Sequence, residues 1–153
     1  MFMFAHIFPM FIFMVLAGLL STMNVYVDRL ADIHWSVNDL YMTLLMTGWM
    51  FFFMGLYAAD FKTGLFGLVL IVFNFGFIRS QFGINQPQYF AGMIPHHSMA
   101  VFLSKKQLEK ASLSPPPPPL NEESLRRRRR INDFLKNIII TQSQEIQFMD
   151  RVL

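Results

Sequence analysis

Two adjacent histidines, with a methionine on either side, make residues 93–99 the densest concentration of metal-ligating side chains in the chain. A second segment, residues 142–149, carries an acidic residue and a further methionine. Imidazole nitrogen and thioether sulfur together suit copper, and the sulfur favours Cu(I). The candidate metal ligands are six side chains from these two segments: His96, His97, Met93, Met99, Glu145 and Met149.

Both segments have a spacing that places their ligating side chains on one face of a helix. Residues three or four apart share a face, as Met93 and His97 do in the first segment and Glu145 and Met149 do in the second. Two antiparallel helices would therefore bring imidazole, thioether and carboxylate together. The alternative is that methionines at this spacing only pack in a core.

The sequence does not favour an enzyme. His97 and Glu145 are in principle an acid–base pair, but no nucleophile or substrate pocket accompanies them in the sequence. The chain contains no cysteine, which excludes a disulfide framework, a thiolate zinc site and a catalytic thiol. We therefore expect a binding or structural protein without catalytic residues.

The first half of the chain is poor in charge. Apolar residues make up 54% of the 153 residues and charged residues only 15%, against roughly 25% charged residues in ordinary soluble proteins. Residues 1–87 contain three basic and four acidic residues, whereas residues 88–153 contain ten and six. The chain therefore divides into a lipid-like half and a basic half.

Three apolar runs in the first half are close to the length needed to cross ~30 Å of hydrocarbon as helices. They cover about residues 2–23, 39–58 and 64–79, so residues 1–80 are predicted to form a membrane domain. A cleaved signal peptide is the alternative for the first run, but no basic segment precedes it.

The second half, residues 81–153, is predicted to form two helices that reverse direction at a proline-rich connector, residues 112–124. Five consecutive prolines in this connector favour a stiff polyproline II spacer. Asn121 or Ser124 is expected to cap the last helix. The predicted fold is all-α, with three transmembrane helices followed by a two-helix antiparallel hairpin outside the bilayer.

Two motifs in the second half resemble those of the domain-of-unknown-function 305 family. The first is Met-Ile-Pro-His-His at residues 93–97, and the second is Ile-Ile-x-x-Gln-x-x-Glu-Ile-x-x-Met at residues 138–149. The first half is similar to the membrane-anchored branch of that family. The resemblance implies a ferritin-like helical domain and, from some secreted members, copper binding. Leu103 stands near a position where many members have cysteine, and the connector is longer than usual.

Five consecutive arginines near the start of the last helix form a block of like charge, which typically binds polyanions. These residues are Arg126, Arg127, Arg128, Arg129 and Arg130. Anionic lipid headgroups are the expected partner, followed by a protein, whereas nucleic acid is not favoured because no base-reading module is present. The excess of basic residues after Arg79 favours the cytoplasmic-type side for the hairpin.

Two functions remain open at this point. The first is a membrane protein that binds copper through the hairpin. The second is a structural membrane protein, for example of a cell envelope or virion membrane, that organises partners or lipid headgroups through its basic helix. The sequence leaves open whether copies of the chain associate as a homo-oligomer.

Overall fold

The computed structural model describes residues 2–113 and 121–153, with side chains from residue 7 onward, and every regular element in these ranges is helical. The predicted all-α fold is therefore confirmed. All five prolines of the predicted connector lie outside the described residues. The five α-helices are α1 (Phe2–Leu20), α2 (Val37–Tyr57), α3 (Phe61–Ser80), α4 (Gln86–Leu113) and α5 (Glu122–Val152).

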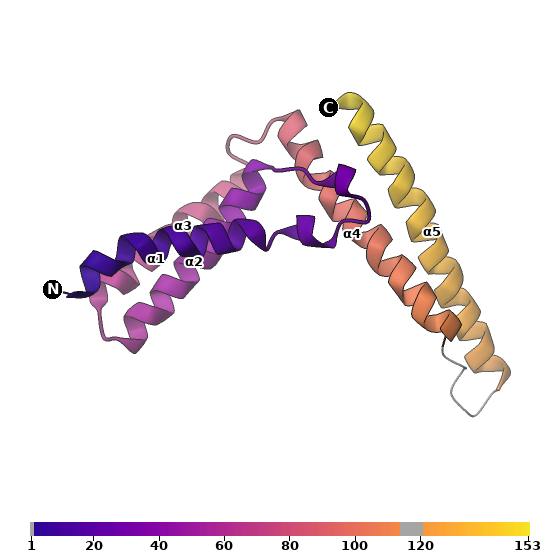
Figure 1. Cartoon of the computed structure of the whole chain (residues 1–153), viewed down its shortest axis with the longest axis horizontal. Coiled ribbons are helices and arrows are strands. Elements are labelled where there is room, and N and C mark those ends of the chain that lie inside the picture. The colour runs from indigo at the N-terminus through magenta and orange to yellow at the C-terminus, as the bar shows by residue number, and fades with distance from the viewer. Residues whose placement is uncertain (1, 114–120) are drawn as a thin grey trace.

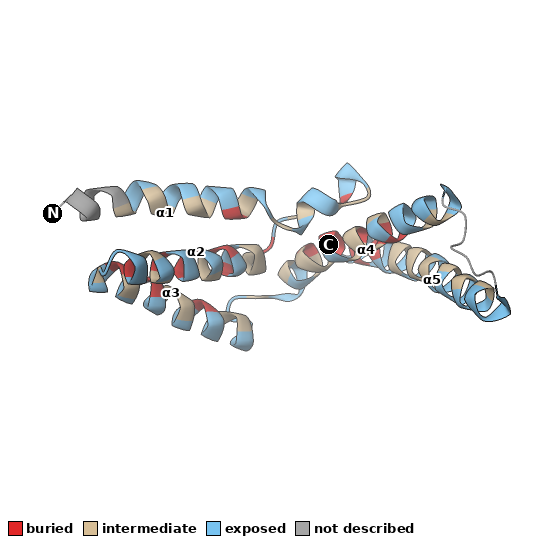
Figure 2. Ribbon diagram, turned by 90° about the horizontal axis from the view of Figure 1, so that it is seen from below, coloured by how far each residue is buried: buried red, intermediate tan, exposed pale blue. Residues whose placement is uncertain are grey.

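Three segments are long and apolar enough to cross a membrane, as predicted. They are Ile7–Tyr26, which includes the end of α1 and the 3-10 turn η1 (Met23–Tyr26), and the helices α2 and α3. Most of their surface is exposed in Figure 2, and the buried positions lie mainly where α2 meets α3. An apolar helix with an exposed apolar surface suits lipid as its solvent.

Helices α2 and α3 begin two and three residues earlier than predicted, because their caps precede the apolar runs. Ser36 and Asp39 form a capping box at the start of α2. At the start of α3 the Asp60 carboxylate accepts a hydrogen bond from the backbone N–H of Lys62. Residues 60–64 have the composition of a tight turn, but residues 61–64 form the first turn of α3.

Glycines allow α2 and α3 to approach each other closely. A Cβ atom on Gly55 would lie 2.2 Å from the backbone nitrogen of Gly64, and one on Gly67 would lie 2.3 Å from that of Phe52. Small residues at a helix contact let two backbones pack in lipid, where apolar surface alone supplies no driving force between helices. The α2–α3 contact therefore depends on the absence of side chains at these positions.

Helices α4 and α5 lie side by side, run in opposite directions and extend away from α1, α2 and α3 (Figure 1). Asn121 caps α5 by accepting a hydrogen bond from the Ser124 backbone, which selects one of the two predicted caps. A small core joins α4 and α5, with partly buried apolar side chains around it. Its fully buried members are Ile94, Val101, Ile146 and Met149.

Adding a methyl group at the α2–α3 contact tests this packing. Gly67→Ala should lower the free energy of unfolding by about 1–3 kcal/mol, because the new Cβ meets backbone atoms that cannot rotate away. Gly76→Ala in the same helix is the matched control, since a Cβ there meets no atom within 4 Å. Unfolding of the detergent-solubilised chain by a denaturing detergent measures the stability of both variants. Equal stabilities of the two variants would contradict the packing of α2 against α3.

Candidate functional site

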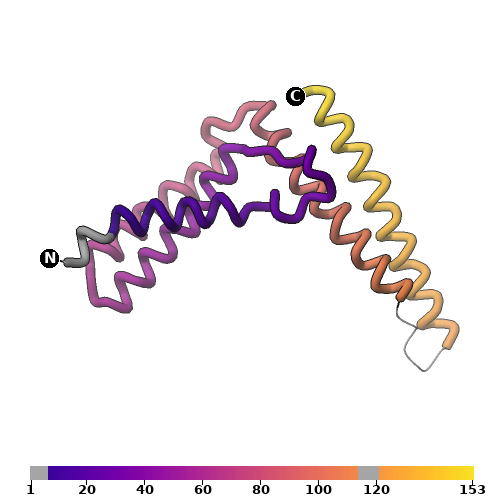
Figure 3. Tube along the Cα trace, in the orientation of Figure 1, coloured from indigo at the N-terminus to yellow at the C-terminus, as the bar shows by residue number. Residues whose placement is uncertain are grey.

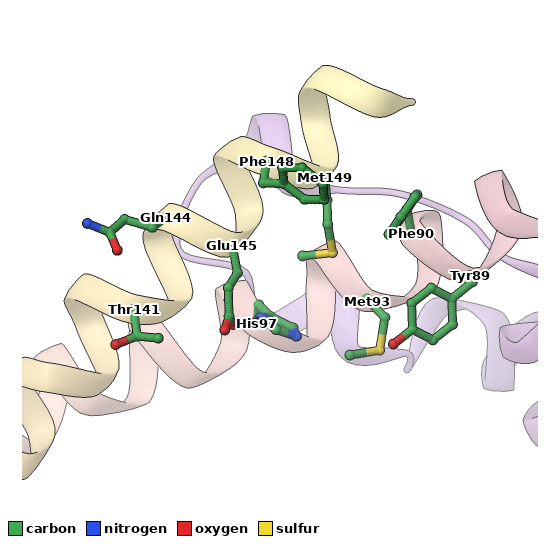
Figure 4. Close-up of a pocket in the computed structure, with 9 residues that line it drawn as sticks. All are labelled: Tyr89, Phe90, Met93, His97, Thr141, Gln144, Glu145, Phe148 and Met149. Atoms are coloured by element: carbon green, nitrogen blue, oxygen red, sulfur yellow. Dashed lines mark ion pairs between the residues drawn. The ribbon is translucent and has the colours of Figure 1, made fainter.

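A pocket of about 470 Å³ opens between the first half of α4 and the last half of α5. Figure 4 shows that the side chains of Glu145 and Met149 on α5 point toward α4, where His97 and Met93 lie. The pocket is lined by Tyr89, Phe90, Met93, His97, Thr141, Gln144, Glu145, Phe148 and Met149. Four of the six predicted metal ligands therefore meet in one place.

The closest polar contact in this pocket joins His97 to Glu145. The His97 Nδ1 atom lies 2.9 Å from Glu145 Oε2, and the His97 side chain is 13% exposed. Nδ1 makes no well-aligned hydrogen bond with any described residue, so the contact is a close approach rather than a straight hydrogen bond. The Glu145 side chain is 46% exposed and has room to rotate into alignment.

Burial lowers the pKa of His97 below its ordinary value of 6.5, although the nearby Glu145 carboxylate acts in the opposite direction. The neighbouring His96 also disfavours a second positive charge. His97 is therefore neutral at neutral pH, with one ring nitrogen near a carboxylate and the other able to act as a ligand. A neutral imidazole is the form that binds a metal ion.

His96 and Met99 do not join the His97 pocket. His96 is exposed and lines a different pocket of about 350 Å³, between α4 and the ends of α2 and α3. Met99 lines neither pocket. Consecutive residues of an α-helix point about 100° apart, so adjacent histidines face different neighbours. Pro95 directly precedes His96, and α4 continues through it.

The donor set of the His97 pocket suits a soft metal better than a hard one. Among the described residues no group of three or more His, Cys, Asp or Glu side chains is close enough to hold a metal ion. A metal in this pocket would therefore depend on the sulfur atoms of Met93 and Met149 together with the imidazole of His97. Thioether sulfur selects Cu(I) among the common transition metals.

A buried polar network on the other side of α4 positions the pocket relative to the membrane helices. The hydroxyl of Ser98 donates a 2.6 Å hydrogen bond to Asp32, whose side chain is almost fully buried. Arg29 forms a 2.7 Å ion pair with the same carboxylate. Lys105 pairs at 2.6 Å with Asp28, whose backbone N–H donates to Ser98.

This network ties the connector between α1 and α2, residues 21–36, to the middle of α4 (Figure 3). No regular pattern in the sequence predicts this contact between the connector and α4. The available signal was weak: two aspartates, Asp28 and Asp32, in a segment between apolar runs, and a serine directly after the two histidines.

Comparison with known proteins identifies a viral relative. No family model matches the chain, and no solved structure matches it significantly. The chain is similar to the uncharacterized protein L153 of Acanthamoeba polyphaga mimivirus, with 36% identity over 142 residues. The match covers 90% of this chain and 84% of the viral protein.

Removing the serine hydroxyl tests the buried network. Ser98→Ala should lower the free energy of unfolding by about 1–3 kcal/mol, because the buried Asp32 carboxylate loses a donor. Thermal loss of helical circular dichroism in detergent micelles measures the change. Ser112→Ala is the control, since this exposed hydroxyl bonds only within α4. If the two variants unfold at the same temperature, the network does not stabilise the contact between the connector and α4.

Proposed function

The chain belongs to the same family as the mimivirus protein, and from this premise we propose that it is an integral membrane protein that binds copper between α4 and α5. The observation that carries the proposal is the meeting of a neutral imidazole and two thioethers in one pocket, contributed by His97, Met93 and Met149. This combination of nitrogen and sulfur is suited to Cu(I).

Glu145 has a supporting role in this proposal. Metal-binding histidines commonly donate one ring N–H to a carboxylate, which fixes the tautomer and directs the other nitrogen at the metal. The 2.9 Å approach of Glu145 Oε2 to His97 Nδ1 matches that arrangement and leaves Nε2 as the ligating atom. Glu145 was predicted as a ligand, whereas its position next to Nδ1 favours the role of an orienting group.

The resemblance to the domain-of-unknown-function 305 family supports the same function. Its two motifs are the segments that supply the pocket, from residues 93–97 and 138–149. The copper link of that family rests on secreted members, and Leu103 replaces a cysteine often found there. The proposed site therefore relies on thioether and imidazole alone.

We further propose that α4 and α5 form an antiparallel hairpin outside the bilayer, on the cytoplasmic-type side. The pair carries ten basic residues after residue 87, whereas the junction of α2 and α3 carries only Lys62, in the first turn of α3. In Figure 1 the pair extends beyond one end of the three membrane helices. Protease added outside sealed cells should leave residues 112–124 intact, and cleavage there would reverse the assignment.

Substitution of the two histidines separates the proposed ligand from its neighbour. His97→Ala should abolish Cu(I) binding by the detergent-solubilised full chain, whereas His96→Ala should leave the affinity nearly unchanged. Glu145→Gln should weaken binding by about 10–100-fold, as expected when an orienting carboxylate is lost. Met149→Leu should weaken Cu(I) binding because leucine offers no sulfur. Competition against a colorimetric Cu(I) chelator measures each affinity.

The pH dependence provides a second readout of the same experiment. Since burial lowers the His97 pKa below 6.5, protons should begin to displace the metal only below pH 6.5. The unfolded chain binds that proton more readily, so the stability of the α4–α5 contact should also fall as the pH drops below 6.5. Equal loss of affinity in the His96 and His97 variants, or no binding by the unaltered chain, would refute the copper site.

A second candidate function follows from the position of the arginines. The end of α4 and the start of α5 lie farthest from the membrane helices in Figure 1. Arg126 pairs with Glu122 at 2.6 Å, and Arg128 donates to the carbonyl of Ala111 near the end of α4. The remaining three, Arg127, Arg129 and Arg130, are exposed.

Because these arginines lie far from the membrane helices, their position favours binding to an anionic surface other than the bilayer in which the chain is inserted. Exposed arginines at that distance from the spans lie beyond the reach of screened attraction to their own headgroups, since the Debye length is about 8 Å at physiological salt. We propose a structural role in which this tip bridges the membrane to a second anionic membrane surface.

Vesicle tethering tests the bridging role. The chain in neutral vesicles should capture added phosphatidylserine vesicles, and Arg127→Gln, Arg129→Gln and Arg130→Gln together should weaken capture about 100-fold, at ~1 kcal/mol per arginine. Glutamine at Lys62, Arg79 and Arg151 removes the same charge elsewhere and should have little effect. Capture that persists in high salt, or an equal loss in both triple variants, would contradict the role.

A further inference from the structure

The two faces of the α4–α5 pair differ in what covers them. On one face the connector between α1 and α2 packs over the pair, and Asp28 and Arg29 share a small pocket with Ser143 and Gln147 of α5. On the opposite face lies the His97 pocket, which is lined from α4 and α5 only. Nothing in the part of the chain that the structure describes is packed over that second face.

The open face carries a continuous stripe along α5. Its members follow one another at spacings of three and four residues, which is the pattern by which one helix packs against another. Several of them are largely exposed, including Phe134 at 64% and Phe148 at 60%. The stripe consists of Ile131, Phe134, Ile138, Thr141, Glu145, Phe148 and Val152.

Helix α4 extends the same face across the pocket. Met93 and Tyr89, which is 47% exposed, line the pocket together with Thr141 and Phe148 of the stripe. The open face is therefore a surface of two helices. This is the geometry of half a four-helix bundle, in which each pair buries its apolar side against another pair.

We propose that the open face docks against the same face of a second copy of the chain, so that two α4–α5 pairs form a four-helix bundle. The three exposed aromatic side chains of the face, Phe134, Phe148 and Tyr89, leave roughly 250–450 Å² of surface per copy, taking aromatic side chains at ~150–250 Å² each. The half-exposed Ile131 and Val152 add to this area. A standard interface buries about 800 Å² per partner, of which somewhat more than half is apolar. The exposed area thus matches what a dimer needs.

The charge on the face argues against a lipid surface as the occupant. Helices that lie on a membrane are rich in lysine and arginine around their apolar side. Here the charged residue within the stripe is Glu145, which an anionic membrane repels. The basic residues Lys136 and Arg151 fall outside the three-and-four spacing of the stripe.

Membrane insertion favours the second copy over a freely diffusing partner. Three spans hold every copy in one plane with one orientation, which raises the effective concentration of matching faces. A two-fold axis then brings identical patches together, as in most homodimers. The second copy would also cover the open side of the His97 pocket, whether or not that pocket holds a metal.

Disulfide cross-linking of the full chain in lipid vesicles tests the dimer. The chain has no cysteine, so a single introduced thiol can pair only with its counterpart in another copy. Thr141→Cys should form a dimer under mild oxidation, because Thr141 is the middle member of the stripe, where a two-fold axis brings a residue close to its own counterpart. Ile140→Cys is the control: it is 57% exposed and points about 100° away from Thr141 around the helix.

A second substitution in the Thr141→Cys background distinguishes cross-linking through a specific interface from cross-linking by random collision of two copies. Phe134→Asp should lower the cross-linked fraction at least tenfold, whereas Ile140→Asp should leave it unchanged, with circular dichroism showing that both variants remain helical. Equal cross-linking of the Thr141 and Ile140 thiols, or no cross-linking of either, would overturn the proposal. Protection of the Thr141 thiol from a water-soluble alkylating reagent without cross-linking would also overturn it and identify the lipid surface as the occupant.

Discussion

The hydrogen bond from Ser98 to the buried carboxylate of Asp32 connects the two halves of this molecule. A buried carboxylate is costly unless charge and donors surround it, so the surrounding groups are constrained to stay in place. Here one donor comes from α4 and the charge from Arg29 in the connector. Because Ser98 directly follows His97, this bond anchors α4 next to the imidazole.

Different kinds of contact hold each of the two halves together. Between α2 and α3, glycines allow close backbone contact, which is the kind of packing that holds helices together in lipid. Between α4 and α5, four fully buried side chains form the core for helices of 28 and 31 residues. A core of that size is small for helices of that length, so the pair depends on the connector and on whatever covers its open face.

Patterns with a regular period could be predicted from the sequence. The three spans follow from long apolar runs, and the approach of Glu145 to His97 follows from ligand-type residues spaced by three and four in both segments. The division between His96 and His97 was not predicted, because the neighbours of each ring come from elements that are distant in the sequence. The connector was missed because contacts between Asp32 and Ser98, 66 residues apart in the chain, leave no periodic signal.

The short link between α3 and α4 gives the molecule a mechanical property. Only five residues separate Ser80 from Gln86, and two of them, Gln81 and Gly83, adopt the left-handed backbone conformation typical of a tight turn. Helix α4 has 28 residues and is therefore about 42 Å long at 1.5 Å per residue. Rotation of this arm by about 5° about its base would displace its far end by ~4 Å. Small tilts of the spans are thus amplified into movements of the arginine-bearing tip.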